Sequence, residues 1–222
     1  MKVIESSADI RHVLGAYHKE NIAFVPTMGC LHEGHLSLIR QAKRLADIVV
    51  VSIYVNPLQF GQGEDLEHYP QPFDQDAKLC AAAGVDILFH PHDLYPEQGL
   101  QVALHVCDLQ HRLCGASRKG HFDGVVTVVN ILFNLIQPQI AIFGEKDFQQ
   151  LSIIRRMVAD LHMPIEIIEG ETVREADGLA KSSRNRYLNE AEREQAAELS
   201  TALNLMVQAA KQGEQPEHIV ML

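Results

Sequence analysis

Short apolar segments alternate with segments of helical periodicity along most of the chain, and this alternation strongly limits the available folds. Five segments are short, apolar and rich in β-branched residues, as buried strands are: 22–27, 47–55, 85–90, 139–143 and 165–168. Between the first two, residues 35–46 place Leu38, Ile39, Ala42 and Leu45 at helical spacing. Strands that alternate with helices predict an α/β fold, with a mostly parallel sheet covered on both faces.

Two later segments are interpreted as helices. Residues 123–137 are rich in valine, but their polar members step by three, four and three positions: Thr127, Asn130, Asn134 and Gln137. This stripe indicates a buried helix, which we expect Asp123 to cap. Residues 146–161 carry a second apolar stripe that includes Leu151 and Ile154, so we expect a helix there as well.

The character of the sequence changes after residue 175. Asn189 precedes a segment rich in Ala, Glu and Leu, Glu192 stands in capping-box register, and Gly213 marks the expected end of the helix. Pro216 then opens a further helix that leads into the apolar run 219–222. We therefore predict one domain over residues 1–175, and over 176–222 the start of a smaller domain that is present only in part.

Length and charge narrow the class of protein. The 222 residues suffice for one large domain, or for one domain and part of another. A net charge of −10 disfavours binding to the phosphate backbone of a nucleic acid. No segment approaches the ~18 to 20 apolar residues of a membrane span, and the charged N-terminal segment lacks the apolar centre of a signal peptide. We expect a cytoplasmic protein that binds neither nucleic acid nor membrane.

The four cysteines, at positions 30, 80, 107 and 114, form no C-x-x-C pair. In a reducing compartment they would remain thiols, so the sequence indicates neither a zinc ribbon nor a disulfide framework. We expect them to be packing residues.

The first chemical motif directly follows the strand 22–27. His32 and His35 stand three apart around Gly34, immediately before the helix 35–46. Ligands of parallel sheets bind where strands end and helix N-termini begin, and two histidines there can donate hydrogen bonds to a triphosphate. The pattern indicates an H-x-G-H nucleotidyl-transfer motif. Two surface histidines at a helix cap are the simpler alternative, and zinc is a poorer one because no third ligand is spaced nearby.

Two other nucleotide signatures are missing, so phosphates must be held by other residues. The segment 61–63 lacks the third glycine of a dinucleotide loop, and no P-loop is present. Segment 144–147 follows the strand 139–143, and we expect Lys146, Asp147 and Gln150 on one helix face. Lysine can neutralise phosphate, while a carboxylate can bind ribose hydroxyls or a metal. The polar loop 181–185 suits β- and γ-phosphates. A solvated helix start and a plain linker are the alternatives for these two segments.

Five segments resemble the pantothenate synthetase family, the pantoate and β-alanine ligases. They are 26–35, 51–60, 116–124, 143–151 and 182–185, and they occur in order over nearly the whole chain. The resemblance implies a Rossmann-like, doubly wound sheet followed by a C-terminal lid domain, which would be incomplete in this chain. It also implies that ATP and pantoate form pantoyl adenylate and pyrophosphate, after which β-alanine attacks to give pantothenate and AMP.

The resemblance also implies roles for individual residues. His35 would be the proton donor, with His32, Lys146 and Arg184 as further catalytic residues, and Arg118 would lie at the edge of the site. Gln59 and Gln150 would bind pantoate, and Gln59 also β-alanine, because an amide offers both a donor and an acceptor. The residues implied for ATP are Met28, Gly29, Cys30, Leu31, His32, Glu33, Gly34, His35, Gly144, Glu145, Lys146, Asp147, Val173, Lys181, Ser182, Ser183 and Arg184. The resemblance implies Mg²⁺ and a homodimer as well.

The chain departs from the family pattern at two places. Lys181 stands where the family more often has an apolar residue. This lysine would add a cation beside the phosphates. Residues 69–72 read Tyr-Pro-Gln-Pro, which weakens any inference about Asp74 or Asp76 as magnesium partners. Two alternatives stay open: another H-x-G-H nucleotidyltransferase, and a nucleotide-binding module made inactive by truncation.

Overall fold

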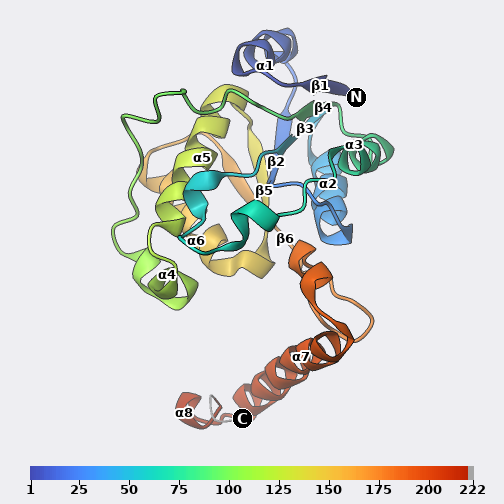
Figure 1. Ribbon diagram of the computed structural model, residues 1–222, viewed down its shortest axis with the longest axis vertical. Helices are drawn as coiled ribbons and strands as arrows, with labels where there is room; N and C mark the ends of the chain where they lie inside the picture. The colour runs from blue at the N-terminus through green and yellow to red at the C-terminus, as the bar shows by residue number, and fades with distance from the viewer. Residues whose placement is uncertain (220–222) are drawn as a thin grey trace. The chain divides into compact units, whose positions relative to one another are not determined.

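The computed structural model describes residues 1–219 (Figure 1). The chain divides into two compact units. The first consists of Met1–Leu31 and His35–Glu171, and the second of His32–Gly34 together with the chain from Thr172 onward.

The first unit is built on a six-stranded sheet in the order β1-β4-β3-β2-β5-β6, and every pairing in it is parallel. The strands are β1 (Lys2–Ile4), β2 (Ile22–Thr27), β3 (Ile48–Ile53), β4 (Ile87–Phe89), β5 (Ile140–Gly144) and β6 (Glu166–Gly170). The prediction of a doubly wound parallel sheet is confirmed. Strand β1 was not predicted, because three residues are too few to show a period.

Helices cover both faces of this sheet (Figure 1). Helices α1 (Ser7–Leu14), α5 (His121–Ile136) and α6 (Phe148–Asp160) pack in one apolar core, and α2 (Glu33–Leu45) and α3 (Phe73–Ala82) pack in the other. Strand β2 serves both cores, since Phe24 faces the first while Ala23 and Val25 face the second. None of the helices within residues 1–219 is both long and apolar enough to cross a membrane.

Short elements complete the first unit. They are α4 (Leu113–Ser117) and five 3-10 helices: η1 (Gly15–Tyr17), η2 (Pro57–Gln59), η3 (Asp65–His68), η4 (Leu109–His111) and η5 (Glu145–Asp147). Two of them, η2 and η5, follow closely after the carboxyl ends of β3 and β5.

The predicted buried helix over 123–137 is confirmed as α5, but its expected cap is wrong. Gly120, with a φ of 80°, is the N-cap, and Asp123 lies within the first turn. The Asp123 carboxylate instead accepts hydrogen bonds from the Val106 amide at 2.8 Å and the His105 ring at 2.9 Å. The Asp123 carboxylate, which local spacing had predicted to cap the helix, thus binds the loop at residues 105–106.

The helix expected over 146–161 begins later than predicted. Lys146 and Asp147 lie in the 3-10 helix η5, and α6 begins at Phe148. A 3-10 turn has three residues per turn rather than 3.6, so the face expected to join Lys146, Asp147 and Gln150 is not one continuous α-helical face.

The second unit contains a 3-10 helix, η6 (Ser183–Tyr187), and the helices α7 (Glu190–Lys211) and α8 (Pro216–Ile219). The predicted capping box is confirmed, because the Asn189 side chain accepts from the Glu192 amide and the Glu192 carboxylate accepts from the Asn189 amide. Gly213, with a φ of 84°, follows the end of α7 as expected. Of the apolar run 219–222, only Ile219 lies within the described residues.

The sheet changes its winding direction between β2 and β5. From β2 the chain passes through α2 to β3 and through α3 to β4, whereas β5 lies on the other side of β2 and continues through α6 to β6. The loops that leave the carboxyl ends of β2 and β5 therefore diverge to opposite faces of the sheet. Ligands of doubly wound folds bind at such a switch point.

Candidate active site

The loop after β2 is held by side chains of neighbouring elements. The Thr27 hydroxyl donates to the Ser52 carbonyl at 2.7 Å and accepts from the Gly29 amide at 3.1 Å. The amides of Cys30 and Leu31 donate to the carboxylate of Asp76, at 2.7 and 2.8 Å. The loop thus has a defined conformation at the carboxyl end of the sheet.

The two histidines of the motif lie at the start of α2. His32 precedes the helix, and its Nδ1 accepts from the Gly34 amide at 3.1 Å. A neutral imidazole that accepts at Nδ1 carries its proton on Nε2, so His32 is prepared to donate from that atom. His35 stands in the first turn of α2 and is half-buried. The expected placement at a helix start is confirmed.

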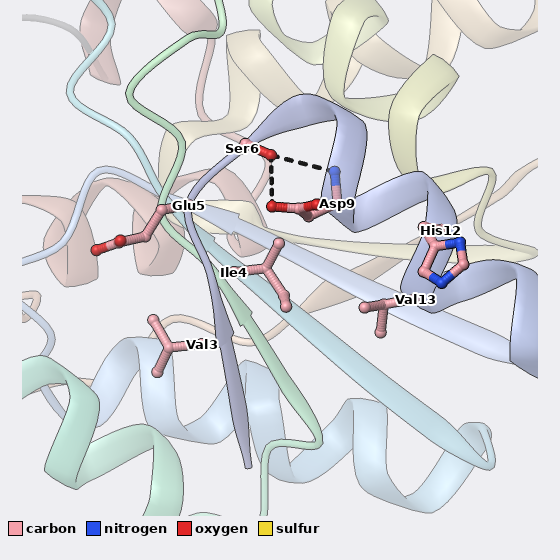
Figure 2. A pocket seen from close by; sticks show the side chains of 7 residues that line it. All are labelled: Val3, Ile4, Glu5, Ser6, Asp9, His12 and Val13. Atoms are coloured by element: carbon pink, nitrogen blue, oxygen red, sulfur yellow. Dashed lines mark hydrogen bonds between the residues drawn. The ribbon is translucent and has the colours of Figure 1, made fainter.

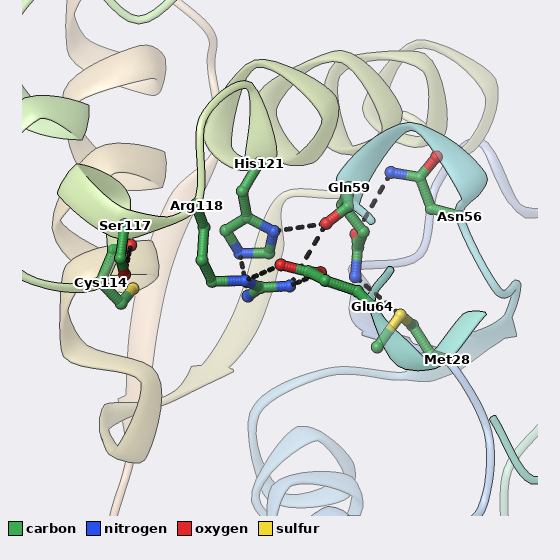
Figure 3. A network of polar contacts seen from close by, with 8 residues as sticks. All are labelled: Met28, Asn56, Gln59, Glu64, Cys114, Ser117, Arg118 and His121. Atoms are coloured by element: carbon green, nitrogen blue, oxygen red, sulfur yellow. Dashed lines mark hydrogen bonds and ion pairs between the residues drawn. The ribbon is translucent and has the colours of Figure 1, made fainter. Parts of the chain in front are cut away.

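The Gln59 side chain is held at both ends (Figure 3). Its Oε1 accepts from the amide of Asn56 at 3.2 Å, and its Nε2 lies 2.7 Å from the sulfur of Met28. Asn56 is 1% exposed and is oriented by the hydroxyl of Tyr95, which donates to its Oδ1 at 2.6 Å. Because β3 leads directly to Asn56, the sheet places this pair beside the loop after β2.

Arg118 and His121 hold the backbone at Gln59. The Gln59 carbonyl accepts from His121 Nδ1 at 2.7 Å and from Arg118 Nη2 at 3.4 Å. A carbonyl can only accept, so His121 carries a proton on Nδ1, and in the neutral ring its Nε2 accepts from Arg118 Nη1 at 3.0 Å. Glu64 completes the cluster, since Arg118 donates to both of its carboxylate oxygens (Figure 3).

The segment after β5 is more open. Lys146 lies 3.4 Å from the carboxylate of Asp147, and both side chains are exposed. Gln150 is half-buried in the first turn of α6. Since β5 pairs with β2, the segment from Gly144 to Asp147 leaves the same edge of the sheet as the loop after β2.

Comparison with known proteins agrees with these features. The sequence profile described as Pantoate-beta-alanine ligase matches residues 2–221. The chain belongs to the pantoate-beta-alanine ligase family. This family forms an amide bond between pantoate and β-alanine.

Several family members are close in sequence. The pantothenate synthetase of Acinetobacter baylyi is 54% identical over 194 residues, which cover 86% of this chain and 69% of that protein. The pantothenate synthetase of Shewanella halifaxensis is 50% identical over 218 residues, which cover 96% of this chain and 77% of that protein.

Solved structures of pantoate-beta-alanine ligases are also similar. The pantothenate synthetase of Thermus thermophilus is 47% identical with a TM-score of 0.94, and the match covers 99% of this chain and 79% of that one. The enzyme of Francisella tularensis, complexed with β,γ-ATP and β-alanine, is 38% identical with a TM-score of 0.87, over 92% of this chain and 79% of that one.

Within this ligase, the first unit brings together most of the residues that the sequence singled out. The carboxyl ends of β2, β3 and β5 carry the loop 27–31, Gln59 and the segment 144–147 on one edge of the sheet. The sequence alone did not indicate Asn56, Glu64 and His121 as parts of the Gln59 cluster. Asn56 and His121 lie in the segments that resemble the family, so the motifs contained them without indicating what they bind.

Val173 and the residues 181–184 belong to the second unit. The Lys181 amide donates to the Val173 carbonyl at 2.9 Å, which closes a small hairpin. The Lys181 ammonium lies 2.6 Å from the Glu175 carboxylate, so the cation expected beside the phosphates already has an anionic partner. The Ser182 side chain caps η6 by accepting from the Arg184 amide at 3.3 Å.

The expectation for the four cysteines has a mixed outcome. Cys30 and Cys80 are buried as expected, whereas Cys107 and Cys114 are exposed, so the prediction that all four are packing residues is wrong for the second pair. Those two lie in loop and short-helix segments away from the sheet cores. Within residues 1–219, no three His, Cys, Asp or Glu side chains gather as a metal site.

A pocket elsewhere in the first unit contains none of the expected site residues (Figure 2). It lies beside the edge strand β1 and the start of α1, and is lined by Val3, Ile4, Glu5, Ser6, Asp9, His12 and Val13. Its Ser6 and Asp9 form the cap of α1, with the Ser6 hydroxyl accepting from the Asp9 amide at 3.1 Å.

The Glu64–Arg118 pair should make the free energy of unfolding depend on pH. The two hydrogen bonds from Arg118 lower the pKa of Glu64 from 4.5 to about 2. A lowered carboxyl pKa contributes stability that is fully present above pH ~4.5 and is lost as the pH falls toward 2. We therefore expect Glu64→Gln to be less stable than the parent near neutral pH, and the difference to shrink between pH 5 and 2.

Urea unfolding at a series of pH values measures this difference in the free energy of unfolding. Arg118→Met provides the control, because Glu64→Gln in that background should no longer produce the acid-dependent difference. A difference that persists unchanged in the Arg118→Met background would show that Arg118 does not lower the pKa.

Proposed function

We propose that this chain condenses pantoate with β-alanine to pantothenate at the expense of ATP, through a pantoyl adenylate. The observation that carries the proposal is the switch-point edge of the sheet, where the loop after β2, Gln59 and the segment after β5 emerge together in a pantoate-beta-alanine ligase. The edge combines a helix N-terminus, a cation and oriented amides, which are the groups that a nucleotide and a hydroxy acid require.

In the first proposed step, a carboxylate oxygen of pantoate attacks the α-phosphorus of ATP. A P–O bond forms to pantoate, the bond to the bridging oxygen breaks, and pyrophosphate leaves with that electron pair. Both reactants are anionic, so positioning and screening of charge are the main tasks of the enzyme. His35 and Lys146 are proposed to contact the phosphates, with His32 donating from the Nε2 that its bond to Gly34 leaves protonated.

In the second step, the amine of β-alanine attacks the carbonyl carbon of the adenylate. A C–N bond forms, the C–O bond breaks and AMP leaves with that electron pair, and the proton lost by the amine passes to water. Gln59 and Gln150 are proposed to hold the hydroxyl and carboxyl oxygens of pantoate, and Gln59 also β-alanine. The support is that Asn56 and the His121 cluster hold both the side chain and the backbone of Gln59.

The remaining assignments of ATP contacts are part of the same proposal. They cover residues 28–35 and 144–147 of the chain, Val173, and Lys181, Ser182, Ser183 and Arg184. Mg²⁺ commonly binds through substrate phosphates and water with few protein ligands. Because residues 1–219 contain no three-ligand cluster, the proposal treats Mg²⁺ as part of the ATP substrate and assigns it no protein ligand.

An assay with purified chain, ATP, pantoate and β-alanine tests the function. We expect equal amounts of pantothenate, AMP and pyrophosphate, and none when pantoate is omitted. Pyrophosphate release with an unrelated acceptor but not with pantoate would favour another H-x-G-H nucleotidyltransferase. ATP binding without turnover would favour a binding module.

The two glutamines give a sharper prediction about pantoate. Gln59→Leu and Gln150→Leu should each raise the KM for pantoate about tenfold, and that for ATP much less, because a substrate oxygen left unpaired in a buried site costs about 1 to 3 kcal/mol. Initial rates at varied pantoate and varied ATP measure both constants.

Gln149→Leu is the matched control, from the adjacent position. The Gln149 side-chain amide donates to the carbonyls of Leu109 and Arg112, at 2.9 and 2.7 Å, and therefore stabilises the conformation of that loop. Gln149→Leu should lower the thermal unfolding midpoint, while the KM for pantoate changes little. Equal effects of Gln59→Leu on both substrates would contradict the pantoate assignment.

Three further points belong to the proposal. We infer that the nucleotide- and pantoate-binding domain covers residues 1–175 and that residues 176–222 begin a lid domain. The proposal also includes a homodimer and a cytoplasmic location. Limited proteolysis tests the division, sedimentation equilibrium the dimer, and cell fractionation the location.

A further inference from the structure

Helix α3 inserts one carboxylate beneath the loop after β2. Asp76 is 1% exposed, although aspartate is among the residue types most rarely buried. Its Oδ2 accepts from the Cys30 amide at 2.7 Å and its Oδ1 from the Leu31 amide at 2.8 Å. Both oxygens thus accept from successive amides of one loop, and hydrogen bonds to a carboxylate are stronger than those between neutral groups.

The loop needs such a restraint. Gly29 and Cys30 both have left-handed backbone conformations, with φ values of 82° and 51°. This conformation is unfavourable for a residue with a Cβ, so Cys30 stores strain that the surrounding structure must offset. Gly29 is also closely packed, since a Cβ at this position would lie 3.0 Å from Asp76 Oδ2. The carboxylate and the turn are therefore shaped to each other.

Part of the surroundings of Asp76 is apolar. Cys80 lies one turn further along α3 and is fully buried in the core that α2 and α3 share. Burial, and after it the charge of Asp76, raise the pKa of the Cys80 thiol to about 12. A charge retained in such a place requires specific hydrogen bonds, and the two loop amides supply them.

We propose that Asp76 is a positioning residue for nucleotide binding: it acts through the backbone of Cys30 and Leu31, which lead into His32 and the start of α2. This inference rests on the proposed function, because it takes the start of α2 as part of the ATP site. Because Asp76 is buried, the proposal gives it no contact of its own with the reactants. Asp76 determines where the loop ends, and thereby where the first amides of α2 and the His35 ring stand.

Asp76→Asn tests the inference with almost no change of shape. The amide keeps one acceptor oxygen and turns an NH₂ group toward the second backbone N–H. We expect the KM for ATP to rise about tenfold, because small displacements of positioning groups strongly reduce rates and binding. The amide protons of Cys30 and Leu31 should also shift upfield and exchange faster in nuclear magnetic resonance spectra of the unliganded protein.

Asp86→Asn is the matched control. Asp86 also binds backbone, accepting from the Val49 amide at 2.8 Å, but it lies at the amino end of β4, away from the switch-point edge. This variant should lower the thermal midpoint and leave the KM for ATP within about twofold of the parent. A KM for ATP that is the same in the Asp76→Asn and Asp86→Asn variants would overturn the inference.

A second pair of variants covers the case in which Asp76→Asn does not fold. Thr27→Val removes the oxygen that accepts from the Gly29 amide, whereas Thr27→Ser retains it. We expect the valine variant to raise the KM for ATP and the serine variant to restore it. Absence of pantothenate formation by the parent chain would refute the proposed function instead, and the amide spectra would still report on Asp76.

Discussion

Replacing His35 or Lys146 by alanine is expected to reduce pantoate-dependent ATP–pyrophosphate exchange by about a hundredfold or more. Removing one donor to the charge that develops in a transition state typically costs that much. Both side chains lie at the switch-point edge, His35 half-buried in the first turn of α2 and Lys146 exposed in η5. Neither is part of an apolar core, so the fold should persist.

Matched controls separate chemistry from general effects of charge or stability. His12→Ala removes an exposed histidine from α1, and Lys78→Ala an exposed lysine from α3. Both controls should retain exchange within about twofold, since substitutions far from a site rarely couple to it. Near-normal exchange in His35→Ala and Lys146→Ala would refute the assignment of the phosphate site.

The double variant indicates whether the two groups act together. If His35 and Lys146 stabilise the same transition state, their combined loss should be smaller than the product of the single losses, as for other groups that act as a unit. Circular dichroism and thermal midpoints of all variants, measured alongside exchange, verify that the comparison is made between folded proteins.

Gly124→Ala should destabilise the protein by about 1 to 3 kcal/mol, although alanine normally stabilises a helix relative to glycine. Gly124 lies in the first turn of α5, where the helix meets η2. A Cβ there would overlap the Leu58 carbonyl oxygen and would lie 2.7 Å from the Gln59 amide nitrogen. These are backbone atoms, so the helix or the turn must move as a whole.

That movement should also reach the proposed pantoate site. Asn56 donates to the Gly124 carbonyl at 3.1 Å and to Gln59 Oε1 at 3.2 Å, so a displaced α5 would disturb the orientation of Gln59. We expect the KM for pantoate to rise together with the loss of stability. Urea unfolding and initial-rate kinetics on the same preparation measure the two effects.

Gly15→Ala should have the opposite effect on the stability of the protein. Gly15 has an ordinary helical conformation with a φ of −56°, and a Cβ there would meet nothing within 4 Å. Alanine at this position should stabilise by about 0.4 to 1 kcal/mol, because it reduces the freedom of the unfolded chain. If Gly124→Ala raised the free energy of unfolding as Gly15→Ala does, this result would contradict the close contact between α5 and η2.

Much of the architecture follows from local sequence. The apolar run 22–27 became β2 with the predicted ends, and the polar stripe through Thr127 and Asn134 identified α5 despite its many valines. The capping box at Asn189 was predicted to the residue. These features depend on neighbours within about one or two turns of the chain, and local periodicity reports such neighbours directly.

The sequence by itself thus determined the alternation of strands and helices, the motif at His32 and His35, and the family. The tertiary structure decided which side chains hold those motifs in place. Asp76 reaches amides 45 and 46 positions away, and Arg118 reaches Glu64 across 54 positions. Local periodicity cannot predict contacts over such long sequence separations, because strand pairing and helix packing determine which residues meet. For the same reason Asp123, expected at a helix cap, binds the Val106 amide instead.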